Sequence, residues 1–424
     1  MFIRPAALAG LFFLSASFAP AAPLSPEEAK LVSYIAADHE ALLTDLEKSV
    51  AISSPTEDLA GVQRCGALAR AQFDELGFTT KWVEMPAEMK RAGHLVAERT
   101  GMHGKRLLFI GHLDTVLPSR SSRRESGKLW GSGASDMKGG NLIVIHALRA
   151  LQSIGALDGT RLIVVFSGDE ESSGRPLEIA RRDLIEAGHR SDYALAFEPA
   201  VRDTITIARR GASGWKLETT GVQAHSAGIF SPAAGAGAVF EAARILNEFR
   251  EKLRAEDGLT FNPALIAGGT DVDLTDPTHA SAGGKTNVIA NRAVVRGDLR
   301  FQTDEQLQRA RAVMREIVAH NLPRTSATIT FEDSYPAMAP TPESQALSAE
   351  LDRVSRDLGF GAIKLLDAKG RGAGDISFVA PFLPSIDGLG ARGEGAHSPN
   401  EFADIASFPE LVERTALLIY RLTR

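Results

Sequence analysis

The sequence predicts an α/β protein with a mainly parallel sheet, helices on both faces of that sheet, and an inserted α+β domain of the ferredoxin-like type. Two changes of rhythm along the 424 residues support this prediction. Up to about residue 204, short apolar runs alternate with helical segments, as they do in parallel sheets. From there to about residue 332 the order becomes strand–helix–strand–strand–helix–strand, and the first rhythm then resumes. We therefore expect a main domain over 23–204 and 333–424 and an inserted domain over 205–332.

The main domain begins with a helical pattern over 24–76. Ser25-Pro26-Glu27-Glu28 supplies an N-cap, a first-turn proline and early acidic residues. Buried strands are predicted at 107–111, 161–168 and 193–199, and further helices at 139–155, 176–188, 343–359 and 408–422. Polar residues directly follow these strands, at the position where ligands bind in sheets of this kind.

The inserted domain has a different pattern. It opens with a long bent strand or strand pair over 204–221, followed by a predicted helix over 233–256. Two strand-like segments, 260–269 and 285–301, come next. A second helix over 303–322 and a strand over 326–333 complete the expected unit.

Bulk composition excludes several classes of protein. The net charge is -6 and no Lys/Arg-rich run is present, so neither nucleic acid nor an anionic membrane is expected as a partner. The chain has one cysteine, Cys65, so it can form neither an intrachain disulfide nor a zinc site built from several cysteines. A length of 424 residues suggests two or three domains.

The N-terminus resembles a secretory signal. Arg4 precedes an apolar run, and Pro20-Ala21-Ala22 supplies small residues at a cleavage point. The run is about 14 residues, which is short for a membrane span. We expect a signal peptide over 1–22 and export, with a periplasmic location. An uncleaved anchor is the alternative.

The chemically promising residues are histidines and acids in ordered clusters. They are His112 and Asp114 in GHLDTV, Asp136 in GASDMKGG, Asp169, Glu170 and Glu171 in GDEESSG, Glu198 in AFEPA, and His397 in GAHSPNEF. Carboxylates beside apolar strands are costly to bury without a partner. A divalent metal is a partner that several of them can share with two imidazoles, and nitrogen and oxygen ligands without thiolate suit zinc, cobalt or manganese.

Five ligands would make two metal sites if one carboxylate bridges them. A catalytic zinc normally takes three protein ligands and keeps one position open. Two metals can then hold one hydroxide and polarise a carbonyl together. Asp114, two residues after His112, is placed to fix the ring of that histidine. Of Glu170 and Glu171, one can bind metal while the other acts as general base and acid.

These ordered motifs together resemble the zinc aminoacylase/carboxypeptidase family. That family includes bacterial glutamate carboxypeptidases, acetylornithine deacetylase and succinyl-diaminopimelate desuccinylase. The motifs resemble those of the glutamate carboxypeptidases most. The resemblance covers essentially the whole mature chain. It implies two Zn²⁺ per subunit, with Asp136 as the bridge, His112 and Glu198 at one metal, and Glu171 and His397 at the other. It also implies that Glu170 is the general acid/base, that Asp114 orients His112, and that the peptide bond after Asp136 is cis.

The resemblance suggests further residues that contact the substrate. His225, in GVQAHSAG, would stabilise an oxyanion and reach the site of the partner subunit in a homodimer formed through the inserted domain. Asn287 and Arg300 match positions that contact substrate. Arg371 and Gly372 begin a loop, 371–377, that would line the carboxylate end of the substrate.

Two details bear on the substrate. Glu198 stands where family members acting at a free amino end tend to have Asp, which favours a product bearing a carboxylate. Glutamate carboxypeptidases carry an arginine before a Pro-Ala segment, whereas this chain has Ser334-Tyr335 before Pro336-Ala337. Strict glutamate specificity is therefore not expected, and Arg371 or Arg300 could supply the cation by bidentate pairing.

We therefore expect a secreted di-zinc hydrolase that cleaves the amide bond of small peptides or N-acyl amino acids and releases a C-terminal amino acid. An N-acyl amino-acid deacylase or a dipeptidase of the same family is the alternative. A two-metal phosphoesterase is a different class, although no cluster of Arg and Lys surrounds the motifs. A relative that kept the fold but lost the chemistry would be expected to lack a ligand first.

Overall fold

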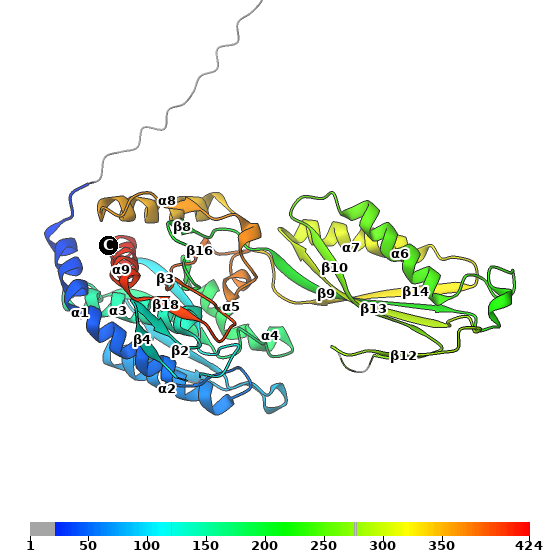
Figure 1. Cartoon of the computed structure of the whole chain (residues 1–424). Helices are drawn as coiled ribbons and strands as arrows, with labels where there is room; N and C mark the ends of the chain where they lie inside the picture. Colours follow the sequence, from blue (N-terminus) through cyan, green and yellow to red (C-terminus); the bar gives the residue numbers. More distant parts are fainter. Residues whose placement is uncertain (1–21, 120, 275, 277) are drawn as a thin grey trace, which may run out of the picture.

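A computed structural model of the chain describes residues 22–119, 121–274, 276 and 278–424. The signal peptide predicted over 1–22 lies outside these residues except for Ala22. Two bodies of unequal size are visible in Figure 1, joined by a narrow connection between β8 and β9. Within the described part of the chain, no helix combines the length and the apolar character needed to cross a bilayer.

The larger body is built on a six-stranded sheet. Its strand order is β1-β2-β6-β3-β7-β16. The strands are β1 (Thr79–Val83), β2 (His94–Arg99), β6 (Thr160–Ser167), β3 (His103–His112), β7 (Tyr193–Ala196) and β16 (Ser385–Asp387). β6, β3, β7 and β16 pair in parallel, and β1 and β2 are antiparallel to their neighbours. The sheet is therefore mainly parallel, as predicted.

Alternate residues of β3 enter two separate cores, which places helices on both faces of the sheet. Leu107 and Phe109 pack in one core with helices α1 (Pro26–Ala51), α2 (Leu59–Glu75), α3 (Gly139–Ser153), α8 (Pro342–Asp357) and α9 (Phe408–Leu422). Leu108 and Ile110 pack in the other core against α5 (Arg182–His189) and the short helix η5 (Asp375–Phe378). The free Cys65 is buried in the first core.

Two predicted helices are broken. The pattern over 24–76 forms α1 and α2 with a turn between them, and the segment 176–188 forms α4 (Leu177–Ala180) and α5. Asp58 caps the start of α2 by accepting the N–H of Gly61, so the chain restarts a helix there. A small antiparallel sheet, β17-β18-β5-β4, was not predicted. It consists of β17 (Gly393–Glu394), β18 (Phe402–Asp404), β5 (Lys128–Trp130) and β4 (Arg123–Glu125).

The smaller body is a four-stranded antiparallel sheet of order β10-β13-β9-β14 with two helices on one face. Its elements are β9 (Gly211–Gly221), α6 (Ala238–Leu253), β10 (Thr260–Gly269), β13 (Arg292–Phe301), α7 (Asp304–Ala319) and β14 (Thr325–Asp333). A hairpin of β11 (Asp271–Asp273) and β12 (Ser281–Gly283) follows β10. The predicted segment 204–221 is divided: β8 (Thr204–Ile205) pairs with β15 (Lys364–Leu365) in the larger body, and only β9 belongs to this sheet.

Candidate metal centre

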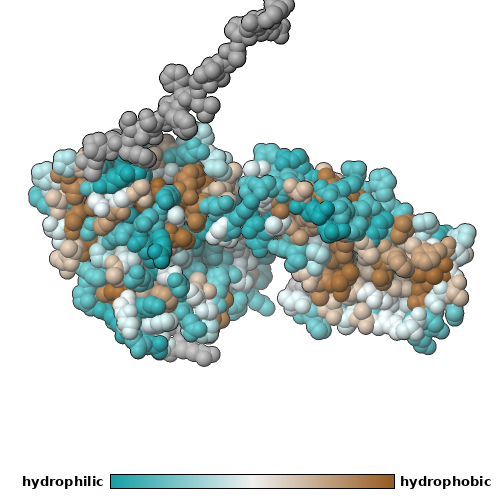
Figure 2. Space-filling model, turned by 45° about the horizontal axis from the view of Figure 1, so that its top comes forward, coloured by the Kyte–Doolittle hydropathy of each residue, from teal (hydrophilic) through white to brown (hydrophobic). Residues whose placement is uncertain are grey.

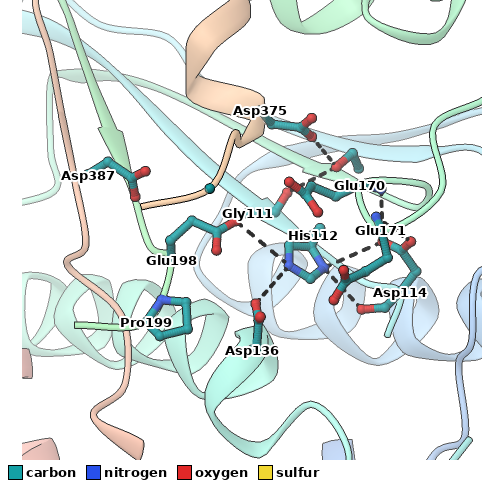
Figure 3. Close-up of polar contacts among 12 residues, drawn as sticks. Gly111, His112, Asp114, Asp136, Glu170, Glu171, Glu198, Pro199, Asp375 and Asp387 are labelled. Carbon is teal, nitrogen blue, oxygen red and sulfur yellow. Dashed lines mark hydrogen bonds and ion pairs between the residues drawn. The ribbon is translucent and has the colours of Figure 1, made fainter. Parts of the chain in front are cut away.

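The ends of three neighbouring parallel strands bring the predicted ligands together. His112 is the last residue of β3, Glu170 and Glu171 follow β6, and Glu198 follows β7. Since β6 and β7 flank β3 in the sheet, their carboxyl ends meet at one edge. Asp136 comes from the turn before α3, and His397 from the loop between β17 and β18. Figure 3 shows the side chains of His112, Asp136, Glu171 and Glu198 converging.

The predicted ligands form two groups of three, and Asp136 belongs to both. One group is His112, Asp136 and Glu198, and the other is Asp136, Glu171 and His397. Its Oδ1 lies 3.3 Å from Nε2 of His112, and its Oδ2 lies 3.3 Å from Nε2 of His397. His112 Nε2 is 3.8 Å from Oε1 of Glu198, and His397 Nε2 is 3.2 Å from Oε2 of Glu171. In each group of three, the ligand atoms lie within 4.8 Å of one another. This is the arrangement that two metals with one shared carboxylate require.

The carboxylates of the cluster repel one another unless cations or protons neutralise them. Burial, and then the charge of Asp136, raises the pKa of Glu198 to about 8. Hydrogen bonds to Asp136 and Glu171 raise the pKa of His397 to about 10. Protons are therefore held where carboxylates crowd, and a divalent cation can take their place. The donor set, two imidazoles and three carboxylates, fits two zinc ions or similar metals.

Glu170 lies beside the cluster. Burial, followed by the charge of Glu198, raises the pKa of its carboxyl well above the usual value. Glu170 also forms a possible three-residue group with His112 and Glu171, so its side chain is within reach of the ligands. A partly buried carboxyl with a raised pKa is suited to taking and returning a proton.

Asp114 contacts both the ring of His112 and the backbone of the turn that carries Glu170 and Glu171. Nδ1 of His112 lies 3.0 Å from the backbone oxygen of Asp114 and 3.4 Å from its carboxylate, so the carbonyl is the closer partner of the ring. The carboxylate accepts the N–H groups of Glu170 and Glu171, both at 3.1 Å. Burial opposes its ionisation, but the bonds and charge of His112 hold the pKa of Asp114 below its usual value. One carboxylate therefore positions both the histidine ligand and the turn that carries the acids.

Glu401 was missed by the sequence analysis. Its carboxylate accepts the N–H groups of Gly133, Ser135 and Asp136 at 2.8–3.0 Å, and so holds the turn that presents the shared ligand. The peptide bond between Asp136 and Met137 is cis, as the resemblance implies. Glu401 follows His397 in the same motif, which was the available signal.

Asp169 belongs to none of the ligand groups found among the described residues. Its carboxylate pairs with Arg181 at 2.6 Å and accepts the N–H of Gly174 at 2.8 Å. Arg181 also pairs with Asp375 at 2.8 Å. Sequence reasoning did not identify Arg181, which lies in no motif, and it assigned no role to Asp375 within the predicted loop 371–377.

Arg371 lies on the Glu198 side of the cluster. Its Nη2 donates to the carbonyl of Pro199, and its Nε donates to the hydroxyl of Thr206 at 3.2 Å. Within the described residues no carboxylate forms an ion pair with it. Burial, and then the charge of Arg209, lowers its pKa. Beside Gly372 the space is open, since a Cβ there would meet no atom within 4 Å.

His225 and Asn287 lie together but far from the cluster. The two segments pair, because the N–H of Ser226 donates to the carbonyl of Asn287 and His225 bridges to Val288. They follow the distal end of β9, whose 11 residues span about 35 Å. Arg300 lies on β13, opposite Ala212 near the other end of β9, and its Nε donates to Asp298 at 2.9 Å. Within one chain the structure does not bring His225 and Asn287 to the ligands, and among the described residues Arg300 pairs with Asp298 rather than with a residue of the cluster.

Comparison with known proteins agrees with this geometry. The model of peptidase family M20/M25/M40 matches residues 108–421. Carboxypeptidase G2 of Pseudomonas sp. (strain RS-16) is 27% identical over 422 residues, covering 96% of this chain and 95% of that protein. Succinyl-diaminopimelate desuccinylase of Acidiphilium cryptum is 29% identical over 402 residues, covering 92% of this chain and 99% of that protein.

Solved structures share the fold. The aminopeptidase PepT structure from Bacillus cereus superposes with a TM-score of 0.73 at 18% identity, covering 91% of this chain and 99% of that one. A Bacillus subtilis protein, described as a dinuclear metal-binding peptidase of the M20 family, superposes with a TM-score of 0.63 at 15% identity, covering 92% and 99%. With the family match over most of the chain and the two groups of ligands that share Asp136, the protein belongs to peptidase family M20/M25/M40 and is a metallopeptidase that hydrolyses amide bonds.

Proposed function

We propose that this protein is an exported di-zinc hydrolase that cleaves the amide bond of small peptides or N-acyl amino acids and releases a C-terminal amino acid. The observation that carries the proposal is the position of Asp136, whose two oxygens face two different histidines, with Glu170 partly buried alongside. His112 and Glu198 would hold one metal, and Glu171 and His397 the other. Bound zinc would polarise the scissile carbonyl and acidify an attacking water.

The residues of the chain divide the remaining work. Glu170, as the carboxylate, takes a proton from the water and later gives it to the leaving amine, and the raised pKa of its carboxyl makes it a stronger base than an ordinary glutamate. Asp114 keeps Glu170 in place through the N–H group of that residue. A hydrogen-bond donor is still needed for the oxyanion, and we assign this role to His225.

The carboxylate of the substrate would bind Arg371. This guanidinium is partly buried beside the cluster and makes its hydrogen bonds to a carbonyl and a hydroxyl rather than to an acid. A charged hydrogen bond to a substrate carboxylate would complete its pairing. Tyr335 stands where glutamate carboxypeptidases have arginine, and its hydroxyl bonds to the protein interior. These observations support a substrate with a free carboxylate and argue against strict specificity for glutamate.

The distance of His225 from the metal ligands supports a homodimer. A partner's inserted domain, which we assign to 205–332, would bring His225 and Asn287 to this site, and closure of that domain would bring Arg300 near the substrate. The exposed large apolar residues of the inserted elements include Phe230, Val239, Phe240 and Ile266, and Figure 2 shows apolar surface on this body. Such surface commonly marks contact with another protein.

The test is a substrate panel on the zinc-loaded mature protein. N-acyl amino acids and dipeptides, each also supplied as the C-terminal amide, are incubated and the released amine is measured. Hydrolysis of the acids but not of the amides supports the proposal. Cleavage of both forms indicates a peptidase that does not recognise the carboxylate. A phosphate ester is included in the panel, and its turnover as the only substrate would indicate a phosphoesterase instead.

A further inference from the structure

Two linkers connect the inserted body to the rest of the chain, and they are hydrogen-bonded to each other. The first linker is 206–210 and the second is 334–338. Arg209 and Met338 exchange both backbone hydrogen bonds, at 2.9 and 3.0 Å. The N–H of Ala212 donates to the carbonyl of Tyr335 at 2.9 Å. A change in the direction of the inserted body therefore moves the two linkers as one unit.

The second linker sends one side chain into the larger body. The ring of Tyr335 packs against Phe378, with ring centroids 5.1 Å apart. Its hydroxyl donates to the carbonyl of Glu170 at 2.9 Å. The same oxygen accepts from the hydroxyl of Ser173 at 2.8 Å and from Nη2 of Arg181 at 3.2 Å. One donated and two accepted bonds use the full capacity of a phenol. Oδ1 of Asp375, at 3.5 Å, is the more distant of the two acceptors within reach of this hydroxyl.

The partners of Tyr335 hold the turn that carries the acids. Arg181, 1% exposed, binds the carboxylate of Asp169 with Nη1 and the backbone carbonyl of Asp169 with Nη2, at 2.6 and 3.1 Å. Its Nε binds Asp375, whose other oxygen accepts from Ser167 at the end of β6. The buried guanidinium of Arg181, between the carboxylates of Asp169 and Asp375, therefore fixes the turn. Such a fully paired buried charge tolerates little displacement.

The residue Glu170 is held from two sides. Asp114 accepts its N–H, and Tyr335 donates to its carbonyl. Asp114 belongs to the metal centre, whereas Tyr335 belongs to a linker. The backbone at Glu170 is thus a point at which the metal centre and the second linker meet, and Arg209 of the first linker lies 4.0 Å from Glu198.

We propose that Tyr335 is a positioning residue for Glu170, through which the orientation of the inserted body sets the place of the catalytic carboxylate. The inference rests on the proposed role of Glu170 as base. When the linkers shift, the phenol moves relative to the carbonyl of Glu170, and the carboxylate leaves the position from which it can reach the attacking water. A displacement of about 1 Å at such a group costs about a hundredfold in rate.

The variant Tyr335→Phe tests this, because it removes the hydroxyl and keeps the ring against Phe378. We expect kcat to fall about ten- to a hundredfold, with KM changed less than about twofold and two zinc ions retained. Ser173→Ala leaves the bond between Tyr335 and Glu170 in place, so a smaller loss of kcat is expected. Tyr193→Phe, on β7 with its ring beside Lys105, is the matched control and should behave as the wild type.

Hydrogen exchange gives a readout that does not depend on turnover. In the full-length protein, amides of the 168–174 segment should exchange about tenfold faster in Tyr335→Phe, while those of β3 and β7 remain protected. Faster exchange throughout the larger body, or loss of zinc, would assign Tyr335 a merely structural role. Wild-type kcat and wild-type exchange would overturn the proposal. If the wild type cleaves no amide, the proposed function fails, and the exchange result still decides whether Tyr335 holds this turn.

Discussion

The carboxylate of Glu401 accepts the backbone N–H of Asp136 at 2.9 Å, so the segment that carries one histidine ligand also holds the shared carboxylate ligand in place. The same carboxylate binds the N–H groups of Gly133 and Ser135. Within the short segment η2 (Ala134–Lys138), Asp136 and Met137 have non-helical backbone angles, so a regular helix does not satisfy these donors. Its geometry therefore depends on a residue far away in the sequence.

Replacement of Glu401 should weaken metal binding. In Glu401→Gln the amide nitrogen would face one of these N–H donors, so the turn loses a hydrogen bond and Asp136 is less well oriented. We expect zinc affinity to fall about 10- to 100-fold, as for other residues that orient ligands. Competition with a chromophoric chelator measures it. Glu394→Gln, in the exposed part of the same region, should bind zinc as the wild type does.

Replacement of Glu170 should separate chemistry from metal binding. Glu170→Gln cannot carry the proton, so kcat should fall about 10²–10⁴-fold while two zinc ions remain bound. Turnover on the best substrate and metal analysis of the same sample are the measurements. A zinc-loaded variant with high residual activity would remove Glu170 from the role of base.

The metal-free protein should lose stability as the pH rises from 6.5 to 8. The pKa of Glu198 is raised from 4.5 to about 8, so its favourable protonated state is lost over that interval. The pKa of His397 is raised from 6.5 to about 10, so the stability that its charge contributes is present below pH 6.5 and declines above it. Both effects have the same sign between pH 6.5 and 8.

Thermal unfolding of the chelated protein at both pH values tests this expectation. Zinc displaces these protons, so the difference in Tm between the zinc-loaded and metal-free forms should widen at pH 8. A Tm of the metal-free form that rises over this interval would contradict the expectation.

Arg371 should matter only for substrates with a free carboxylate. Loss of a charged hydrogen bond is worth about 1.5–3 kcal/mol, so Arg371→Ala should raise KM about 10- to 100-fold for acids. Steady-state kinetics on an acid and its amide make the comparison, with Arg202→Ala as the control. Equal losses on both substrates would sink this assignment.

His225 should act on the site of the partner subunit. Separately, His225→Ala and Glu170→Gln should each be nearly inactive. Mixed and reassembled, half of the dimers would pair the two variants, and each such dimer would combine an intact Glu170 with an intact His225 at one site. Activity should then return to about a quarter of the wild-type value, because one site in four is complete. No recovery on mixing would show that His225 does not act between subunits.

The candidate ligand residues could be found from local sequence. His112, Glu171 and Glu198 each follow an apolar run, and such runs form parallel strands whose carboxyl ends share one edge. The mainly parallel sheet followed from the alternation of strands and helices. The break between α1 and α2 contains Ser53-Ser54-Pro55, a breaker signal that the single helical pattern over 24–76 overlooked, whereas no Pro or Gly marks the break between α4 and α5.

By itself the sequence determined the class of chemistry: imidazoles, carboxylates and a spare acid in ordered motifs imply a two-metal centre. Only the tertiary structure decided which distant residues support that centre. Glu401 reaches Asp136, and Tyr335 reaches Glu170, across 265 and 165 positions. Local periodicity reports which face of an element is buried, but not which distant side chain meets it, because that depends on how whole elements pack. The resemblance implies that His225 acts on the partner subunit, and its separation from the ligands of its own chain depends on β9, which extends away from the larger body.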